Sequence, residues 1–220
     1  MRVLYSKNLV FISKPRCGST SIRKTLDQYA QQQKGDFGVD YADEYPPYHP
    51  HITAPHLKKL LKINFPSRVF PESFICIRHP LDMLFSYYKY FSPDRSCLYN
   101  YNKGYEKNHK ISYERWIISG KVGINPNWAK LAPPWITGSN FSPLSLEAHS
   151  ENDKCKNIID NIFKIEEIET LENWLSGKLG SKIVIPKINK SLALKIPPVS
   201  TEALERIRHM FPKESAIYNV

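Results

Sequence analysis

The chain has 220 residues, of which 31 are lysine or arginine and 21 are aspartate or glutamate, giving a formal net charge of +10. This length is enough to bury a sizeable core, and we expect one domain spanning residues 1–220, because no linker divides the sequence. The positive charge favours an anionic ligand such as a nucleotide or a sulfated sugar, although it also fits an ordinary basic surface. The basic residues are spread along the chain without a polybasic tail, which disfavours nucleic acid as a partner.

The cysteines and the hydrophobic segments bear on metals and on location. No two of the four cysteines form a Cys-x-x-Cys pair, so we expect no metal site. Cysteines at apolar positions, such as Cys76, favour a reducing compartment, although an even count also permits disulfides. The chain shows no signal-peptide pattern and no segment near the roughly 20 apolar residues of a membrane span, so we expect a cytoplasmic protein. Its pattern does not indicate an oligomeric state.

Residues 9–22 are the first stretch with a clear pattern, which is typical of a strand, a tight turn and a helix start. The apolar run Leu9–Ile12 resembles a covered parallel strand. A glycine in the turn and hydroxyl residues after it suit a helix beginning there. Its free backbone N–H groups, together with a nearby arginine, predict an anion site. The candidate anion-binding residues are Arg16, Cys17, Gly18, Ser19, Thr20 and Ser21.

The next segments alternate between helical patterns and a long loop. Apolar residues at helical spacing predict a helix over residues 20–33 and a shorter one over residues 56–63. Residues 35–55 between them have little periodicity, and long irregular segments in compact domains are usually functional or mobile. This loop contains two histidines, His49 and His51.

A second strand, turn and helix follows with the same plan as the first. Residues 74–78 read as a buried strand, and Pro80 starts a helix that extends to about Phe91. Arg78 stands at the end of the strand, and Ser86 stands two helical turns later. Arginine can hold a phosphate through two parallel hydrogen bonds, so this pair is a second candidate anion site. Taken alone, the pair also fits a structural salt bridge with a filler serine.

The rest of the chain gives weaker signals. We predict a loop or lid over residues 92–111, a short helix over 112–119 and a Pro- and Trp-rich stretch over 125–138. Helices are predicted over residues 152–162 and 167–179, with a short strand at 163–165 between them. A loop over residues 187–199 precedes an amphipathic helix over 201–210, capped by Ser200 or Thr201.

The first turn differs from the phosphate loop of ordinary NTPases. That loop needs a lysine directly after its last glycine, whereas Gly18 is followed by Ser19 and the basic residue precedes the glycine. Taken together, residues 15–20 (PRCGST) and 77–88 (IRHPLDMLFSYY) resemble the sulfotransferases that use 3′-phosphoadenosine 5′-phosphosulfate (PAPS). Residues 157–166 and 188–191 also look like later segments of that family.

The resemblance implies a role for each motif. The first turn would hold the 5′-phosphosulfate, and Arg78 with Ser86 would hold the 3′-phosphate. The loop containing Lys190 and Ser191 would close over the nucleotide. Many members have lysine where Arg16 stands, whereas others, including tyrosylprotein sulfotransferases, have arginine. Arg16 would then act on the leaving phosphosulfate, and Lys14 is a substitute candidate.

Residues 48–51 (YHPH) resemble the Tyr-His-Gly-His segment of heparan and dermatan/chondroitin uronosyl 2-O-sulfotransferases. The resemblance implies that His51 is the catalytic base and that His49 assists it. A histidine suits this role because its pKa lies near neutrality. Two other interpretations remain: the pair could bind a metal, or it could lie on a loop surface. Glu44 in the same loop is the alternative base.

These features together predict a three-layer α/β domain with a mainly parallel central sheet, of the P-loop-like sulfotransferase type. The expected reaction transfers a sulfuryl group from PAPS to an acceptor hydroxyl of a carbohydrate or glycan, leaving adenosine 3′,5′-bisphosphate. The alternatives are a P-loop-related nucleotide-dependent kinase and a non-catalytic polyanion-binding protein. The former would need ATP and Mg²⁺, and the latter would show a steep salt dependence without preferring a nucleotide.

Overall fold

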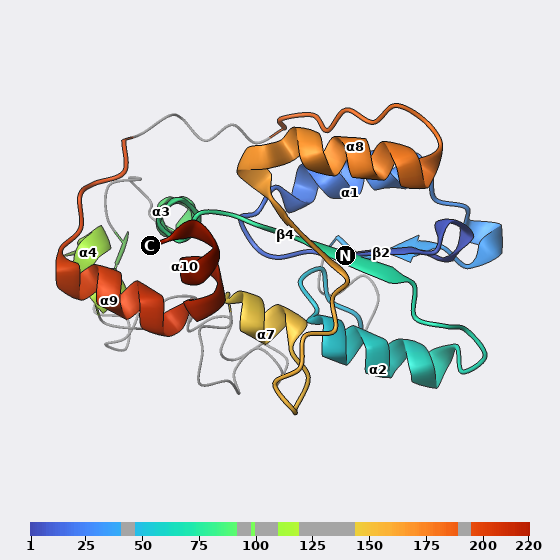
Figure 1. Ribbon diagram of the computed structural model, residues 1–220, viewed down its shortest axis with the longest axis horizontal. Coiled ribbons are helices and arrows are strands. Elements are labelled where there is room, and N and C mark those ends of the chain that lie inside the picture. Colours follow the sequence, from blue (N-terminus) through green and yellow to red (C-terminus); the bar gives the residue numbers. More distant parts are fainter. Residues whose placement is uncertain (41–46, 92–97, 100–109, 119–143, 189–194) are drawn as a thin grey trace. The chain divides into compact units, whose positions relative to one another are not determined.

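A computed structural model describes residues 1–40, 47–91, 98–99, 110–118, 144–188 and 195–220 (Figure 1). The chain forms two compact units. Unit 1 comprises Met1–Arg78 and His149–Lys190, and unit 2 comprises His79–Ala148 and Ser191–Val220. Each unit is built from two separate pieces of the chain, so each is described by itself.

Unit 1 contains a five-stranded sheet in the order β3-β1-β2-β4-β7. The strands β2, β4 and β7 pair in parallel, whereas β1 pairs antiparallel with both β2 and β3. The α/β class is therefore confirmed, but the sheet is mixed, and among the described strands its parallel part comprises β2, β4 and β7. The strands are β1 (Arg2–Leu4), β2 (Leu9–Ile12), β3 (Phe37–Gly38), β4 (Glu72–Ile77) and β7 (Asn161–Lys164).

The antiparallel start of the sheet follows from a short connection. A 3₁₀ turn (Tyr5–Lys7) joins β1 to β2, and Asn8 after it adopts a left-handed conformation with φ 50°. Such a short link reverses the chain, because a parallel pair needs a crossover of a dozen or more residues. By contrast, β2, β4 and β7 are separated by long segments that contain helices.

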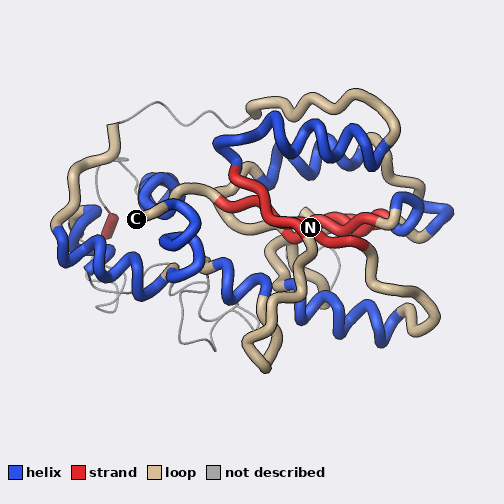
Figure 2. The backbone as a smooth tube through the Cα atoms, viewed as in Figure 1, coloured by secondary structure: helices blue, strands red, loops and turns tan. Residues whose placement is uncertain are grey.

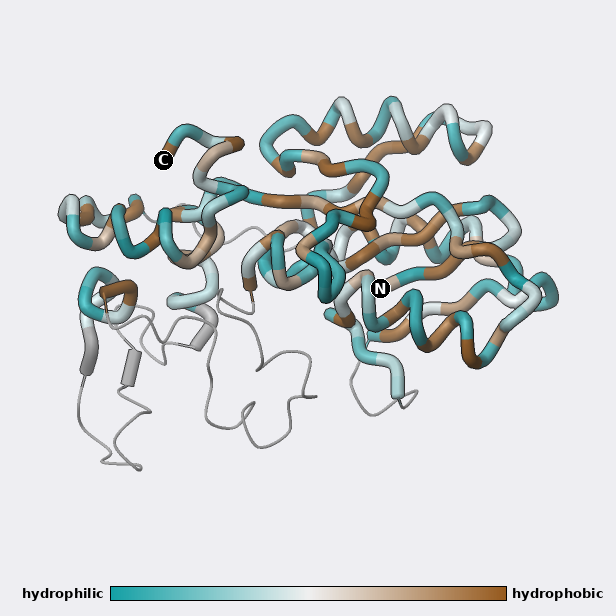
Figure 3. The backbone as a smooth tube through the Cα atoms, turned by 60° about the horizontal axis from the view of Figure 1, so that its bottom comes forward, coloured by the Kyte–Doolittle hydropathy of each residue, from teal (hydrophilic) through white to brown (hydrophobic). Residues whose placement is uncertain are grey.

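Helices cover both faces of this sheet (Figure 1). Helices α1 (Ser19–Asp27) and α8 (Ile168–Leu179) lie on one face, and α2 (Ala54–Asn64) lies on the other. Figure 2 shows the strands between these helical layers. In Figure 3 the strands are mainly hydrophobic, whereas the helices alternate between hydrophobic and hydrophilic residues. This alternation is expected where one face of a helix packs on a sheet.

Aromatic rings fill the space between the sheet and α8. Phe11 and Phe74 on neighbouring strands stack with ring centroids 4.9 Å apart. Trp174 of α8 contacts Phe74 edge to face at 5.2 Å and lies 5.1 Å from Phe163. Aromatic pairs of this kind add stability beyond their buried area. These contacts fix α8 over the parallel strands.

The helix predicted over residues 152–162 is wrong. The side chain of Asn152 accepts hydrogen bonds from the backbone N–H groups of Lys154 and Lys156, at 3.0 and 3.1 Å. The side chain of Asn157 accepts one from Ile159 at 3.0 Å. Local bonds of this kind offer the backbone an alternative to a helix. The chain therefore forms turns here and then enters β7, with the 3₁₀ turn Ile165–Glu167 leading into α8.

The other predicted elements of unit 1 occur close to their expected bounds. The predicted strands at residues 9–12 and 74–78 are β2 and β4, and the predicted helices 56–63 and 167–179 are α2 and α8. The predicted helix 20–33 is shorter: α1 ends at Asp27, and a separate 3₁₀ turn follows at Gln32–Lys34.

Unit 2 is mainly helical. The predicted helices appear as α3, α4 and α9, and the Ser200 side chain caps α9 by accepting from the Ala203 N–H at 3.4 Å. Buried rings from α3 and α4 form its core, for example Tyr88 and Tyr113 at 5.4 Å. Its elements are α3 (Pro80–Phe91), β5 (Leu98–Tyr99), β6 (Lys110–Ile111), α4 (Tyr113–Ile118), α9 (Thr201–Met210) and α10 (Pro212–Tyr218), and α7 (Leu146–Ser150) crosses the boundary between the units.

Some predictions fall outside the described residues. These are the Pro- and Trp-rich stretch at 125–138, most of the loop at 92–111 and the part of the last loop at 189–194. Of the helices that the structure describes, none combines the length and the apolar character needed to cross a membrane.

Candidate functional site

The turn between β2 and α1 has an uncommon backbone. Arg16 and Gly18 both have positive φ angles, of 61° and 73°. A left-handed conformation is costly for any residue except glycine, and strained residues of this kind gather at functional sites. Cys17 between them is not in this region. Backbones that alternate in this way turn successive N–H groups toward one side, which creates a concave anion site.

Gly18 is required for a second reason besides its φ angle. A Cβ atom at this position would lie 2.6 Å from Cδ1 of Ile165, in the 3₁₀ turn after β7. A larger residue here would have to displace the Ile165 side chain, so the turn packs against the residue that directly follows β7. The backbone of the turn is therefore held close to the sheet.

The first turn of α1 supplies backbone donors. The first hydrogen bond into the helix is from the Ile22 N–H to the Gly18 carbonyl, at 3.2 Å. The N–H groups of Ser19, Thr20 and Ser21 precede it and have no acceptor within the helix. They also carry the positive end of the helix dipole. These are the donors that the sequence predicts for an anion.

The segment before the predicted closing loop reaches the same helix turn. The Ile188 N–H donates to the Ser21 side chain at 3.3 Å. Lys190 and Ser191 follow two and three residues later and lie outside the described residues. Their predicted role over the nucleotide stays a prediction, although the chain enters the loop beside the anion turn.

Lys14 and Arg16 differ in how far they are buried. Lys14 is only 1% exposed, and its Nζ lies 3.9 Å from the Cys17 sulfur. Arg16 is half-buried. Arg16 is therefore the more accessible of the two candidate cations. Cys76 on β4 is also buried, and burial, with a smaller contribution from Cys17, raises the pKa of its thiol well above the ordinary value.

Arg78 comes to the same edge of the sheet as the turn. It directly follows β4, which pairs in parallel with β2 on one side and β7 on the other. The register pairs Ile12 with Ile75 and Ile77 with Lys164, so the three carboxyl ends are adjacent. Ligands of such sheets bind beyond these ends.

Ser86 belongs to unit 2, where it is 5% exposed on α3. Arg78 is the last residue of the first piece of unit 1. The expected joint action of these two residues on a 3′-phosphate therefore stays a prediction.

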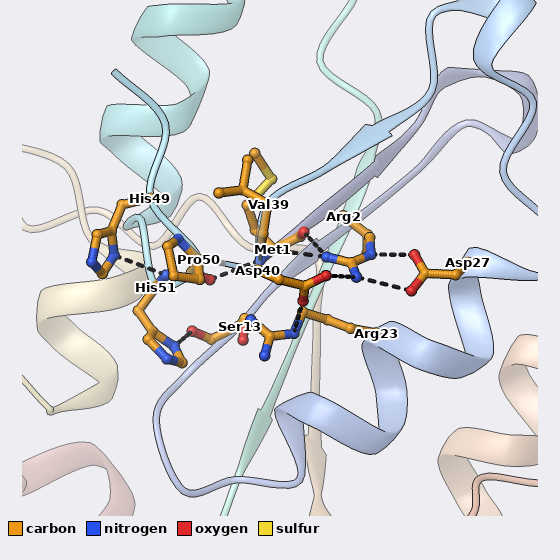
Figure 4. Close-up of polar contacts among 10 residues, drawn as sticks. All are labelled: Met1, Arg2, Ser13, Arg23, Asp27, Val39, Asp40, His49, Pro50 and His51. Carbon is orange, nitrogen blue, oxygen red and sulfur yellow. Dashed lines mark hydrogen bonds and ion pairs between the residues drawn. The ribbon is translucent and has the colours of Figure 1, made fainter. Parts of the chain in front are cut away.

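The fold brings His51 to the start of the turn between β2 and α1. Its Nδ1 lies 2.7 Å from the carbonyl oxygen of Ser13, which is the residue after β2 (Figure 4). A carbonyl oxygen only accepts, so Nδ1 carries a proton and donates it. In the neutral ring the lone pair is then on Nε2. The bond therefore fixes both the place and the tautomer of a candidate base.

His49 supports the same segment in the opposite way. Its Nδ1 accepts a hydrogen bond from the backbone N–H of His51 at 3.1 Å. Between the two histidines, the Pro50 carbonyl accepts from the Met1 nitrogen at 2.7 Å. The two rings have their centroids 6.0 Å apart. Because Nδ1 of each ring is already in a hydrogen bond, the pair is poorly prepared to bind a metal through these atoms.

Burial keeps both histidines neutral near pH 7. Burial is the main cause that lowers the pKa of His51 well below its ordinary value. The hydrogen bond to the Ser13 carbonyl raises this pKa, and the Met1 nitrogen, Arg23 and His49 lower it when they are protonated. Burial, followed by the charge at Met1, lowers the pKa of His49 from about 6.5 to about 4. A neutral imidazole is the form that accepts a proton.

The structure does not describe the alternative base of the histidine loop, and its described residues contain no metal-binding cluster. The alternative base, Glu44, lies in the undescribed residues 41–46. Within the described ranges, no group of three or more His, Cys, Asp or Glu side chains is suited to a metal ion.

Sequence reasoning missed the residues that hold the histidine segment, above all Ser13 and Arg23. Ser13 acts through its backbone, so its residue type gives no signal. Arg23 follows Ser19 by four positions and thus shares its helix face, which is a usable but weak signal.

No protein-family model matches this chain, and the comparison with curated proteins gives no match either.

Proposed function

We propose that this protein is a sulfotransferase that moves a sulfuryl group from PAPS to an acceptor hydroxyl of a carbohydrate. The observation that carries the proposal is the hydrogen bond between His51 Nδ1 and the Ser13 carbonyl. This contact joins a histidine of defined tautomer to the residue just before the anion turn. A base beside an anion-binding turn is what transfer from an anionic donor to a hydroxyl requires.

The residues around the turn fit a phosphosulfate group. Gly18 adopts a left-handed conformation and packs closely on Ile165, and the N–H groups at the start of α1 have no acceptor within the helix. Arg16 adds a positive charge in the same turn. Arg78 follows the neighbouring strand, where it would hold a further phosphate. When bound, PAPS would supply the sulfuryl group at this turn.

His51 would act as the general base. Its Nε2 would take the proton of the acceptor hydroxyl while the acceptor oxygen forms its bond to sulfur. The proton makes the ring cationic, and the Ser13 carbonyl then stabilises the Nδ1–H that it already accepts from. Arg16 and the α1 N–H groups would stabilise the negative charge that develops on the departing phosphate, and preorganised groups of this kind are often a major source of rate acceleration.

Calorimetry with adenosine 3′,5′-bisphosphate and with ADP tests the nucleotide. We expect the bisphosphate to bind more tightly, and we expect Arg16→Ala and Arg78→Ala to weaken its binding by about tenfold or more each, since hydrogen bonds to charged groups contribute about 1.5–3 kcal/mol. Arg68→Ala is a matched control, because Arg68 lies over the Tyr5 ring and bonds to the Lys34 carbonyl. Equal binding of ADP and the bisphosphate would contradict the proposal.

Incubation with radiolabelled PAPS and a panel of sugar acceptors tests the reaction. We expect His51→Ala to lose turnover while keeping its affinity for adenosine 3′,5′-bisphosphate. Full turnover in His51→Ala with loss in Glu44→Ala would move the base to Glu44. Transfer of phosphate from Mg²⁺-ATP would instead support a kinase.

A further inference from the structure

The segment that carries the histidines is attached to the rest of unit 1 through a small set of charged residues. Arg2 on β1 and Arg23 on α1 are both buried, at 3% and 9% exposure. Asp40 follows β3 and forms ion pairs with both arginines, at 2.8 Å to Arg2 and 3.2 Å to Arg23 (Figure 4). Asp27 pairs with Arg2 through both of its oxygens. Buried guanidinium groups need such partners, because an unpaired buried charge is strongly destabilising.

Arg2 reaches these carboxylates by crossing the neighbouring strand at a glycine. A Cβ atom at Gly38 would lie 2.6 Å from Nε of Arg2. Gly38 pairs with Arg2 in the antiparallel register, so the missing side chain opens the path that the arginine takes. Nη1 of Arg2 also donates to the carbonyls of Met1 and Val39, at 3.0 and 3.4 Å. The guanidinium thus binds backbone and carboxylates together.

Backbone hydrogen bonds through Met1 connect these charged residues with the histidine segment. The Val39 N–H donates to the Met1 carbonyl at 3.3 Å, and the Met1 nitrogen donates to the Pro50 carbonyl at 2.7 Å. Met1 therefore connects the residue before Asp40 with the residue between His49 and His51. The chain on both sides of residues 41–46 is held at one point.

We propose that Asp40 and Arg23 are positioning residues for His51. By joining β1 to α1, Asp40 holds the segment that bears His51 in place, so that Nδ1 meets the Ser13 carbonyl. Arg23, which pairs with Asp40 at 3.2 Å, adds to the effect of burial on the protonation of His51. This inference rests on the proposed function only where it treats His51 as the base.

The groups around His51 determine whether a substitution raises or lowers its pKa. The groups that act on it are the Met1 nitrogen just before β1, Arg23 from α1, His49 from its own segment and the Ser13 carbonyl just after β2. Arg23 lowers the pKa of His51, so removing this cation allows protonation at a higher pH. Loss of the ion pairs of Asp40 would also expose the His51 ring to water. Exposure to water favours the protonated ring and therefore also raises its pKa.

Two-bond ¹H–¹⁵N NMR of the histidine rings, recorded across a pH titration, tests the inference. In the native protein we expect His51 as the Nδ1–H tautomer and His49 as the Nε2–H tautomer. We expect Asp40→Asn to convert His51 to a mixture of tautomers, and Asp40→Glu to recover the single tautomer. We expect Arg23→Gln to raise the titration midpoint of His51.

Asp27→Asn is the matched control. Asp27 and Asp40 pair with the same arginine at similar side-chain exposure, 46% and 44%, but of the two only Asp40 also pairs with Arg23. We expect Asp27→Asn to leave the His51 tautomer unchanged. The inference would be overturned if Asp27→Asn lost the single His51 tautomer as Asp40→Asn does. An unchanged His51 titration in Arg23→Gln would also overturn it.

These spectra do not depend on catalysis. If the native protein fails to prefer adenosine 3′,5′-bisphosphate while the spectra change as expected, the proposed function fails and the positioning role stands. If the nucleotide binds as expected and the His51 spectra do not respond, the positioning role alone fails. Far-UV circular dichroism checks that each variant is folded, and Arg23→Gln decides the matter should Asp40→Asn unfold.

Discussion

The two histidines make the stability of the fold depend on pH. Their pKa values are lowered in the folded chain, with that of His49 at about 4, so the unfolded chain binds protons first as the pH falls. The contribution of the histidines to the free energy of unfolding is therefore expected to be constant above about pH 6.5 and to decrease from there toward pH 4. Urea unfolding at several pH values measures this slope.

The variant His49→Gln/His51→Gln is the comparison for that slope. Its stability is expected to depend less steeply on pH between about 6.5 and 4, because glutamine does not titrate. If the variant and the native chain show parallel curves, the histidines are not the cause.

Gly18 is a single residue on which the anion turn depends. We expect Gly18→Ala to lower the free energy of unfolding by about 1–2 kcal/mol through its left-handed conformation alone. The close approach to Ile165 adds to this cost, because the new Cβ would lie 2.6 Å from Cδ1. Denaturation with urea measures the loss, and calorimetry measures the expected loss of nucleotide binding.

Local patterns identified the chemistry of single residues but not their partners. Gly18 and Arg16 were predicted as parts of a turn because a tight turn has a short-range signature. The contact between His51 and Ser13 joins residues 38 positions apart, and no local sequence pattern indicates it. Asp40 was missed for the same reason, because its partners lie on β1 and α1.

Gly177 in α8 provides the opposite case to Gly18. It lies within the helix, and a Cβ atom there would contact nothing within 4 Å. We expect Gly177→Ala to raise the free energy of unfolding by roughly 0.5–1 kcal/mol, because alanine loses less backbone freedom on folding. A decrease in urea stability would mean that α8 is not packed as described.

The cap of α9 gives a second test of a helix. The Ser200 side chain accepts from the Ala203 N–H, so we expect Ser200→Ala to cost about 1 kcal/mol. Ser200→Asp keeps a cap acceptor and is expected to remain near native stability. Thermal unfolding distinguishes the two variants. If both lose the same stability, the loss does not come from the hydrogen bond of the cap.

The elements that the sequence predicted well have signals within themselves. Strands β2 and β4 are uninterrupted apolar runs, and α3 begins at a proline that suits the first position of a helix. Strand β1 has only three residues, Arg2–Leu4, which is too short for a pattern. The helix predicted at 152–162 was wrong because the spacing of apolar residues gives no information on the hydrogen bonds that the Asn152 and Asn157 side chains make with the backbone.

The net charge of +10 predicts nonspecific binding to polyanions in addition to any specific site. We expect the native protein to bind a heparin column and to elute as salt is raised. We expect Arg16→Ala to elute at nearly the same salt concentration, because it removes one of 31 basic residues, while it loses nucleotide affinity. If Arg16→Ala loses heparin binding entirely, the turn itself is a polyanion site.

The position of β7 has a consequence for synthesis on the ribosome. Strand β4 ends at Ile77 and pairs with β2 on one side, but its parallel partner on the other side begins at Asn161, after a long piece of the chain that belongs to unit 2. Until that partner leaves the exit tunnel, β4 is an unpaired edge with apolar side chains such as Phe74 and Ile75. Such edges recruit other strands, so the nascent chain is most exposed to misassembly during this interval. Chaperone contacts with the growing chain are therefore expected to be concentrated between the emergence of β4 and that of β7.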